Sequence, residues 1–256
     1  MKATISKIRS MKGKEKITML TAYDYFTAKA MDEEGIDIIL IGDSLGMVVL
    51  GYENTLSVTV DDIMRHTGAV ARASKNALIV ADMPVNSYND NESAALNAEA
   101  FIKSGADNVK IENNPEIAKF LVENNFEVMA HIGLTPQTIT DFKVQGKEKS
   151  SEIKLINLAK ELENAGCYSI VLECVPAMLA KKITESISIP TIGIGAGPYC
   201  DGQVLVVNDI LGLYDKLSPK FVKKYADLGK EMKNAFKSYI KDVKQGNFPK
   251  EEHSFH

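Results

Sequence analysis

Short apolar runs alternate with amphipathic stretches along almost the whole chain, and this alternation constrains the fold more than any other feature. Eight runs are rich in Ile and Val, and they occupy residues 16–24, 36–44, 77–84, 107–113, 126–133, 168–175, 189–197 and 201–209. Stretches with helical spacing lie between most of them, at residues 25–35, 60–74, 92–106, 115–125, 153–166 and 176–188. Continuously apolar strands that alternate with helices indicate a parallel sheet buried on both faces.

Three glycines support this repeat. Gly35, Gly105 and Gly166 each stand where a helix should end before the next strand, as C-terminal caps do. Eight units in 256 residues favour an α/β fold of the closed (β/α)8 TIM-barrel type. An open doubly wound sheet stays an alternative, because strand order cannot be read from one sequence.

The chain contains no low-complexity linker, so we expect a single domain over residues 1–256. The polar segment QGKEKSSE, residues 145–152, is predicted to be an exposed loop after the fifth strand. Residues 218–256 are predicted to form a long helix followed by a tail.

Composition argues against two classes of partner. The net charge of −4 gives no global basic field, so neither nucleic acid nor a membrane surface is expected as a partner. The first residues lack the apolar region of a signal peptide, and no apolar stretch approaches membrane-spanning length. Cys167, Cys174 and Cys200 fit reduced thiols, and we expect a cytoplasmic protein.

Acidic residues end three successive predicted strands. Asp43, Asp82 and Glu112 are spaced by about one strand-and-helix unit, so a parallel sheet would bring their carboxylates to one edge. Each could instead cap the helix that follows it, since Asp is a common N-cap. Three such acids in succession favour a site for a hard divalent cation such as Mg²⁺.

Other polar residues lie at the same predicted edge. Lys110 is two residues from Glu112 and shares its strand face, which permits either a local ion pair or a substrate contact. Ser44 follows Asp43 at a strand-to-helix turn, where it could hold a carboxylate. Glu173 ends an apolar run, and apolar surroundings raise the pKa of a carboxylate, which suits a general base near neutral pH. Glu173 could instead form a salt bridge with a lysine of the barrel. His131 could bind a metal or substrate, or could be a core histidine.

Several motifs of this chain resemble those of the ketopantoate hydroxymethyltransferase family. The similarity follows the order of the chain through GDSLG, ADMP, VKIE, HIGLTPQ, KVQG, LECVP, GIGAG and the terminal EEHSFH. It implies a (β/α)8 barrel of the phosphoenolpyruvate mutase and isocitrate lyase type. One departure is that TPQTITDFKVQG lacks the glycine-containing insertion that the family often has before KVQG.

The resemblance also implies a reaction. Members transfer a hydroxymethyl group from 5,10-methylenetetrahydrofolate to 3-methyl-2-oxobutanoate through a Mg²⁺-stabilised enolate, giving 2-dehydropantoate for pantothenate and coenzyme A synthesis. By motif, Asp43, Asp82 and Glu112 correspond to the metal site, with one Mg²⁺ per subunit. The substrate positions are Asp43, Ser44, Asp82, Lys110 and His131, and Glu173 corresponds to the catalytic proton acceptor.

The resemblance further implies a large homo-oligomer, often a decamer. Two alternatives stay open at this point. One is a Mg²⁺-dependent C–C lyase or mutase of the phosphoenolpyruvate mutase type, which would turn over its substrate without folate. The other is a non-catalytic barrel that binds an oxo acid.

Overall fold

The computed structural model describes residues 2–138, 143–216 and 219–256. Contacts divide the chain into two compact units, Met1–Val206 and Val207–His256, which are described separately below. The expectation of one domain over residues 1–256 stays a prediction.

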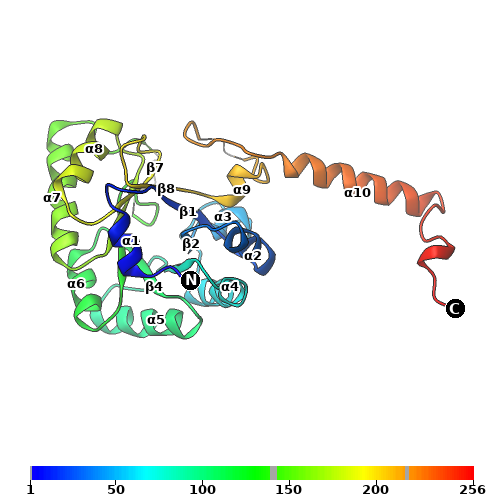
Figure 1. Ribbon diagram of the computed structural model, residues 1–256, viewed down its shortest axis with the longest axis horizontal. Coiled ribbons are helices and arrows are strands. Elements are labelled where there is room, and N and C mark those ends of the chain that lie inside the picture. The colour runs from blue at the N-terminus through cyan, green and yellow to red at the C-terminus, as the bar shows by residue number, and fades with distance from the viewer. Residues whose placement is uncertain (1, 139–142, 217–218) are drawn as a thin grey trace. The chain divides into compact units, whose positions relative to one another are not determined.

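The first unit is a closed barrel of eight parallel strands, each paired with its neighbours in chain order (Figure 1). The strands are β1 (Ile17–Thr21), β2 (Ile38–Ile41), β3 (Leu78–Asp82), β4 (Asn108–Glu112), β5 (Val128–Gly133), β6 (Ser169–Glu173), β7 (Thr191–Ile194) and β8 (Gly202–Leu205). Strand β8 closes the ring by pairing with β1, in the register that sets Ile17 opposite Gly202. All eight predicted strands and the closed barrel are confirmed, and the open-sheet alternative is wrong.

Helices connect the strands and surround them (Figure 1). They are α1 (Ile5–Met11), α2 (Tyr25–Glu33), α3 (Leu45–Val48), α4 (Val60–Ala73), α5 (Asn91–Lys103), α6 (Pro115–Glu123), α7 (Lys149–Asn164) and α8 (Ala177–Ser186). The three predicted glycine caps are confirmed. Gly35, Gly105 and Gly166 follow α2, α5 and α7 with φ of 82°, 110° and 96°, values that residues with a side chain rarely adopt.

Two local predictions need correction. The segment QGKEKSSE is not wholly a loop, because α7 begins at Lys149. Glu152 in the first turn of α7 pairs with Lys182 of α8 at 2.6 Å, a contact between helices that sequence spacing does not reveal. Helix α1 was not predicted at all; its Ile8 and Met11 are buried in one apolar cluster with Ile17 of β1. The first helix therefore extends the barrel core.

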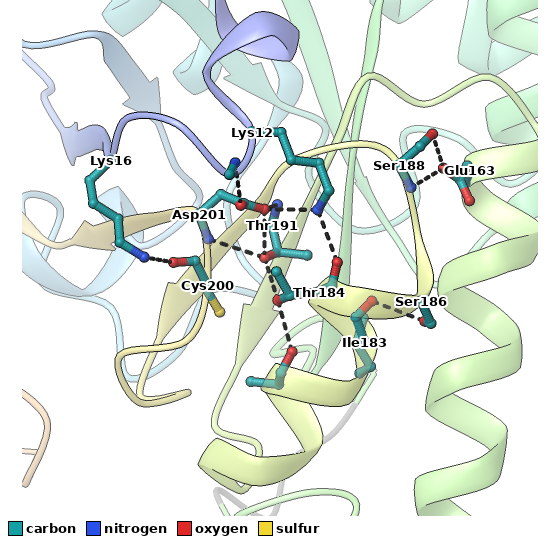
Figure 2. Close-up of polar contacts among 12 residues, drawn as sticks. Lys12, Lys16, Glu163, Ile183, Thr184, Ser186, Ser188, Thr191, Cys200 and Asp201 are labelled. Atoms are coloured by element: carbon teal, nitrogen blue, oxygen red, sulfur yellow. Dashed lines mark hydrogen bonds and ion pairs between the residues drawn. The ribbon is translucent and has the colours of Figure 1, made fainter.

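Polar contacts join the segments before the strands at one edge of the barrel (Figure 2). Asp201, just before β8, accepts hydrogen bonds from the backbone N–H of Gly13 at 3.1 Å and of Thr191 at 2.9 Å. It also forms a largely buried ion pair with Lys12 at 3.0 Å. Figure 2 shows these contacts converging on Asp201. This carboxylate therefore ties the turn after α1 to β7 and β8.

The second unit contains α9 (Val207–Ile210), α10 (Leu228–Lys244) and the short 3-10 helix η1 (Glu251–His253). The predicted long helix followed by a tail is confirmed in α10, but the helix begins only at Leu228, and residues 219–227 before it are not helical. In the described parts of both units, no helix has the length and apolar character needed to cross a membrane. The three cysteines are free thiols, as predicted.

Candidate active site

The three predicted acids lie on neighbouring strands at the carboxyl edge of the barrel. Asp82 and Glu112 are the last residues of β3 and β4, and Asp43 follows β2. The backbone N–H of Asp43 donates to Asp82 Oδ2 at 3.2 Å. Glu112 lies opposite His131 in the register of β4 and β5. The convergence expected from their spacing is therefore present.

Capping does not explain Asp82 and Glu112. The next helices are capped by other side chains: Asp90 caps α5, and Asn114 caps α6. Both acids are instead almost fully buried, with exposed fractions of 2% and 4%. Burying a carboxylate is unfavourable unless partners compensate, so these positions need another explanation.

Negative charge is concentrated around Asp43 and Asp82. Burial and the nearby Asp82 carboxylate raise the pKa of Asp43 to about 8, although Lys110 acts in the opposite direction. Burial likewise raises the pKa of Asp82 above its ordinary value, against the influence of Lys110. The Asp43–Asp82 pair would thus gain stability from a further cation.

Lys110 lies among the acids. Its closest ion-pair partner is not Glu112 on the same strand, as the sequence suggested, but Asp82 on the neighbouring strand. Its Nζ lies 2.6 Å from Asp82 Oδ1 on the next strand. Burial disfavours the ammonium charge, yet Asp82, Glu112 and Asp43 together raise the pKa of Lys110. Lys110 is therefore a permanently charged group inside the site.

His131 joins two glutamates. Its Nδ1 lies 3.1 Å from Glu112 and its Nε2 lies 3.2 Å from Glu173. Burial opposes protonation of the ring, but these two carboxylates raise the pKa of His131 to about 9. Burial would also raise the pKa of Glu112, yet its hydrogen bond with His131 lowers it. The histidine is therefore an imidazolium at neutral pH, held between two carboxylates.

Glu173 is the most accessible of these acids. Its side chain is 18% exposed, whereas that of Glu112 is 1% exposed. Its surroundings differ from the expected apolar ones, because His131 is a charged neighbour. Glu173 therefore combines an ionic partner with access to a ligand.

Ser44 is the N-cap residue of α3 and makes a contact that spacing did not predict. Its Oγ lies 2.8 Å from the hydroxyl of Tyr23, a buried residue that follows β1. The Ser44 side chain makes no capping hydrogen bond to α3. The tyrosine thus fixes the direction of the serine hydroxyl beside Asp43.

Two further residues of the site were missed by sequence reasoning. Gln137 donates from Nε2 to Asp43 Oδ2 at 3.0 Å, and its Oε1 accepts from the hydroxyl of Tyr88 at 2.5 Å. Both residues lie in loops, where no periodicity marks a side chain as buried. The available signals were the position of Gln137 shortly after a strand that carries His131 and its place at the end of the motif HIGLTPQ.

The acids do not form a ready-made metal cage. Among the described residues, no three His, Cys, Asp or Glu side chains form a group that could hold a metal ion. Glu112 is engaged by His131 and by the backbone N–H of Gln137 at 3.3 Å. Asp43 and Asp82 are the carboxylates best placed to share an ion, and Mg²⁺ commonly uses one or two carboxylates together with substrate and water.

The loop before KVQG was expected to differ from the family pattern. Residues 139–142 of that loop lie outside the described residues. Gln145, after them, donates its backbone N–H to the carbonyl of Cys174 at 2.8 Å, which connects KVQG to the segment after Glu173.

Solved structures support the fold. The barrel is similar to 2,3-dimethylmalate lyase, a PEP mutase/isocitrate lyase superfamily member, with a TM-score of 0.62 and 14% identity over 98% of this chain and 92% of that one. It is also similar to phosphonopyruvate hydrolase in complex with oxalate and Mg²⁺, with a TM-score of 0.65 and 10% identity over 95% and 88%. At such low identity the similarity concerns the fold, and it confirms the predicted barrel type.

Sequence comparison identifies the family. The model of the ketopantoate hydroxymethyltransferase family matches residues 2–251. A 3-methyl-2-oxobutanoate hydroxymethyltransferase from Clostridium novyi (strain NT) is 55% identical over 100% of this chain and 96% of its own length. One from Enterococcus faecalis (strain ATCC 700802 / V583) is 55% identical over 98% and 92%. The resemblance of the motifs thus extends to the whole sequence, and the chain belongs to the ketopantoate hydroxymethyltransferase family.

Proposed function

We propose that this chain transfers a hydroxymethyl group from 5,10-methylenetetrahydrofolate to 3-methyl-2-oxobutanoate in pantothenate synthesis. The oxo acid, the folate and one water are consumed, and 2-dehydropantoate and tetrahydrofolate are formed. Family membership supports this reaction over the lyase and binding-protein alternatives. The observation that carries the chemistry is the buried Asp43–Asp82 pair beside Lys110.

A divalent metal fits this pair. Their carboxylate oxygens are the ligands that Mg²⁺ prefers. Burial, together with neighbouring carboxylates, raises the pKa of each acid against the opposing influence of Lys110. Asp43 and Asp82 would hold the ion directly, and Glu112 would act directly or through water. When bound, Mg²⁺ supplies Lewis-acid polarisation of the 2-oxo group of the substrate.

Lys110 and Ser44 are proposed to hold the substrate. Lys110 keeps its charge, so its ammonium can attract the anionic oxo acid while it remains paired with Asp82. Ser44 presents a hydroxyl fixed by Tyr23, which can hydrogen-bond a substrate oxygen. Together these two side chains would orient the oxo acid with its C3 carbon free to react.

Glu173 is proposed to remove the C3 proton. Glu173 lies 3.2 Å from Nε2 of His131, and a positioned carboxylate can accept a proton. The electron pair of the broken C3–H bond would stay on C3, which would form a C–C bond with the one-carbon unit of the folate. The two C–N bonds that hold this carbon would break, and water would supply the oxygen of the new hydroxymethyl group. The two protons of the water would complete the N–H groups of tetrahydrofolate, and the proton taken from C3 would end on the new hydroxyl. The greater accessibility of Glu173 supports this role over Glu112, which is buried behind His131.

A product assay tests the proposal. Purified protein is incubated with 3-methyl-2-oxobutanoate, methylenetetrahydrofolate and Mg²⁺, and then with each component omitted in turn. We expect 2-dehydropantoate only when all three are present. Turnover of the oxo acid without folate would indicate a lyase or mutase, and binding without turnover would indicate a non-catalytic barrel.

The cellular context is also part of the proposal. We expect the chain to work in the cytoplasm, where small oxo acids and folates are available, and to assemble into a homodecamer. Both expectations rest on family membership.

A further inference from the structure

Gln137 occupies an unusual place for a loop residue. It follows β5 by a few residues, yet only 6% of it is exposed. Burying an amide is unfavourable unless its donors and acceptor are satisfied. In this residue the backbone and the side chain both make polar contacts with the site.

The contacts of Gln137 define the orientation of its amide. The Nε2 group donates to two acceptors, Asp43 Oδ2 at 3.0 Å and the carbonyl of Met83 at 2.9 Å. The Oε1 atom accepts from Tyr88. Exchanging the oxygen and nitrogen would place an acceptor against a carboxylate and a carbonyl, so only one orientation satisfies the network.

The same residue reaches a second carboxylate. The backbone N–H of Gln137 donates to Glu112 Oε2 at 3.3 Å, and the N–H of Glu112 donates to the Tyr88 hydroxyl at 3.4 Å. Gln137 thus contacts acids that follow β2 and end β4, and it does so without adding charge. Neutral donors are suited to this place, because a further carboxylate would repel both acids and a cation would compete with a metal ion.

We propose that Gln137 is a positioning residue that holds the Asp43 and Glu112 carboxylates in the orientation required to bind the metal, with Tyr88 fixing its amide. The inference rests on the proposed function, since it assumes that Asp43 binds Mg²⁺. Residues that orient metal ligands without touching the metal commonly change metal affinity by tenfold to a hundredfold when they are replaced.

Gln137→Met tests the proposal, because Met fills a similar volume and lacks the side-chain amide that contacts Asp43, Met83 and Tyr88, while it keeps the backbone N–H that donates to Glu112. Gln203→Met is a matched control, in which the lost amide hydrogen bond goes to the carbonyl of Gly197. Mg²⁺ affinity is measured by isothermal titration calorimetry, and stability by urea unfolding. We expect Gln137→Met to bind Mg²⁺ on the order of tenfold to a hundredfold more weakly. We expect Gln203→Met to bind as wild type does.

A structural role alone would lower the urea midpoint of Gln137→Met and leave the Mg²⁺ affinity of its folded fraction intact. That result would overturn the proposal. If Gln137→Met does not fold, Tyr88→Phe replaces it, because it removes the donor to Gln137 Oε1 together with the acceptor of the Glu112 N–H and leaves Gln137 in place. We then expect Mg²⁺ affinity to fall about threefold or more, and wild-type affinity would overturn the inference.

Asp43→Asn separates this inference from the proposed function. If Asp43→Asn loses Mg²⁺ binding while Gln137→Met retains it, the positioning role is wrong and the metal assignment stands. If Asp43→Asn binds Mg²⁺ as wild type does, the metal assignment is wrong and the positioning role falls with it.

Discussion

Asp32, in the last turn of α2, offers a sharp test of how this barrel is held together. Its carboxylate is 6% exposed and accepts hydrogen bonds from the backbone N–H groups of Lys75, Asn76 and Ala77, at 3.0, 2.8 and 2.8 Å. It also accepts from the hydroxyl of Ser74 at 2.7 Å. One side chain thus fixes the segment that leads into β3.

Asp32→Asn keeps the size of this side chain and removes its charge. Hydrogen bonds to a charged group are worth roughly 1 kcal/mol more than neutral ones, and the new NH₂ group leaves at least one donor without an acceptor. We therefore expect the free energy of unfolding to fall by about 3 kcal/mol at pH 7.

The loss should depend on pH in a defined way. Burial opposes ionisation of Asp32, but its hydrogen bonds lower the pKa from 3.8 to about 2. A lowered pKa in the folded state stabilises the protein above pH 3.8, and the stabilisation is lost as the pH falls towards 2. The difference between wild type and Asp32→Asn should therefore be constant from pH 5 to pH 8 and shrink below pH 4.

Urea unfolding, followed by circular dichroism at one protein concentration and several pH values, measures this difference. Glu33→Gln is the matched control, since the neighbouring acid is 64% exposed and pairs with Lys29 at 3.7 Å; we expect a change of about 0.5 kcal/mol or less. The reasoning would be refuted if Asp32→Asn were no more destabilising than Glu33→Gln at pH 7. It would also be refuted if the destabilisation were the same at pH 7 and pH 3.

Three further predictions concern the proposed reaction and assembly. Asp43→Asn and Asp82→Asn should each weaken the binding of both Mg²⁺ and the oxo acid, on the order of tenfold or more, without unfolding the barrel. If calorimetry shows wild-type Mg²⁺ affinity for either variant, the replaced residue is not part of the metal site. Glu173→Gln should bind the oxo acid yet lose both C3 proton exchange in D₂O and product formation by about a hundredfold or more. Proton NMR of the isopropyl group reports this exchange, and exchange at the wild-type rate would show that Glu173 is not the base. In sedimentation, the 28.1 kDa chain should run far above a dimer, and a fully active monomer would show that assembly is dispensable.

Much of the fold could be predicted because it follows from local signals. The apolar runs correspond to the strands of the barrel. Glycines such as Gly105 and Gly166 follow the ends of helices and adopt positive φ. The start of α7 could not be predicted, because the contact between Glu152 and Lys182 depends on how two helices pack. Helix α1 was missed because its two buried residues are too few for a clear periodic pattern.

The site residues that lie at the ends of strands could be predicted from the sequence, whereas contacts between strands and residues in loops were harder to predict. Parallel strands bring Asp82 and Glu112 to one edge whatever the details of packing. The ion-pair partner of Lys110 depends on the register between β3 and β4, which sets Lys110 opposite Asp82. Spacing along one strand suggested Glu112 as the partner instead. Gln137 lies in a loop, so only the three-dimensional structure shows that it contacts Asp43.

The pairing of β1 with β8 has a consequence for how the chain becomes active during synthesis. Every other strand pair joins neighbours along the chain, but this pair joins Ile17 to Gly202. All the strands that carry the candidate site, β2 to β6, are complete before β8 has been made. The ring cannot close until β8 is available, and the entropy cost of joining such distant segments must be met at that step. A nascent chain that stops before Gly202 would therefore carry every proposed catalytic residue and still lack the closed barrel that holds them in place.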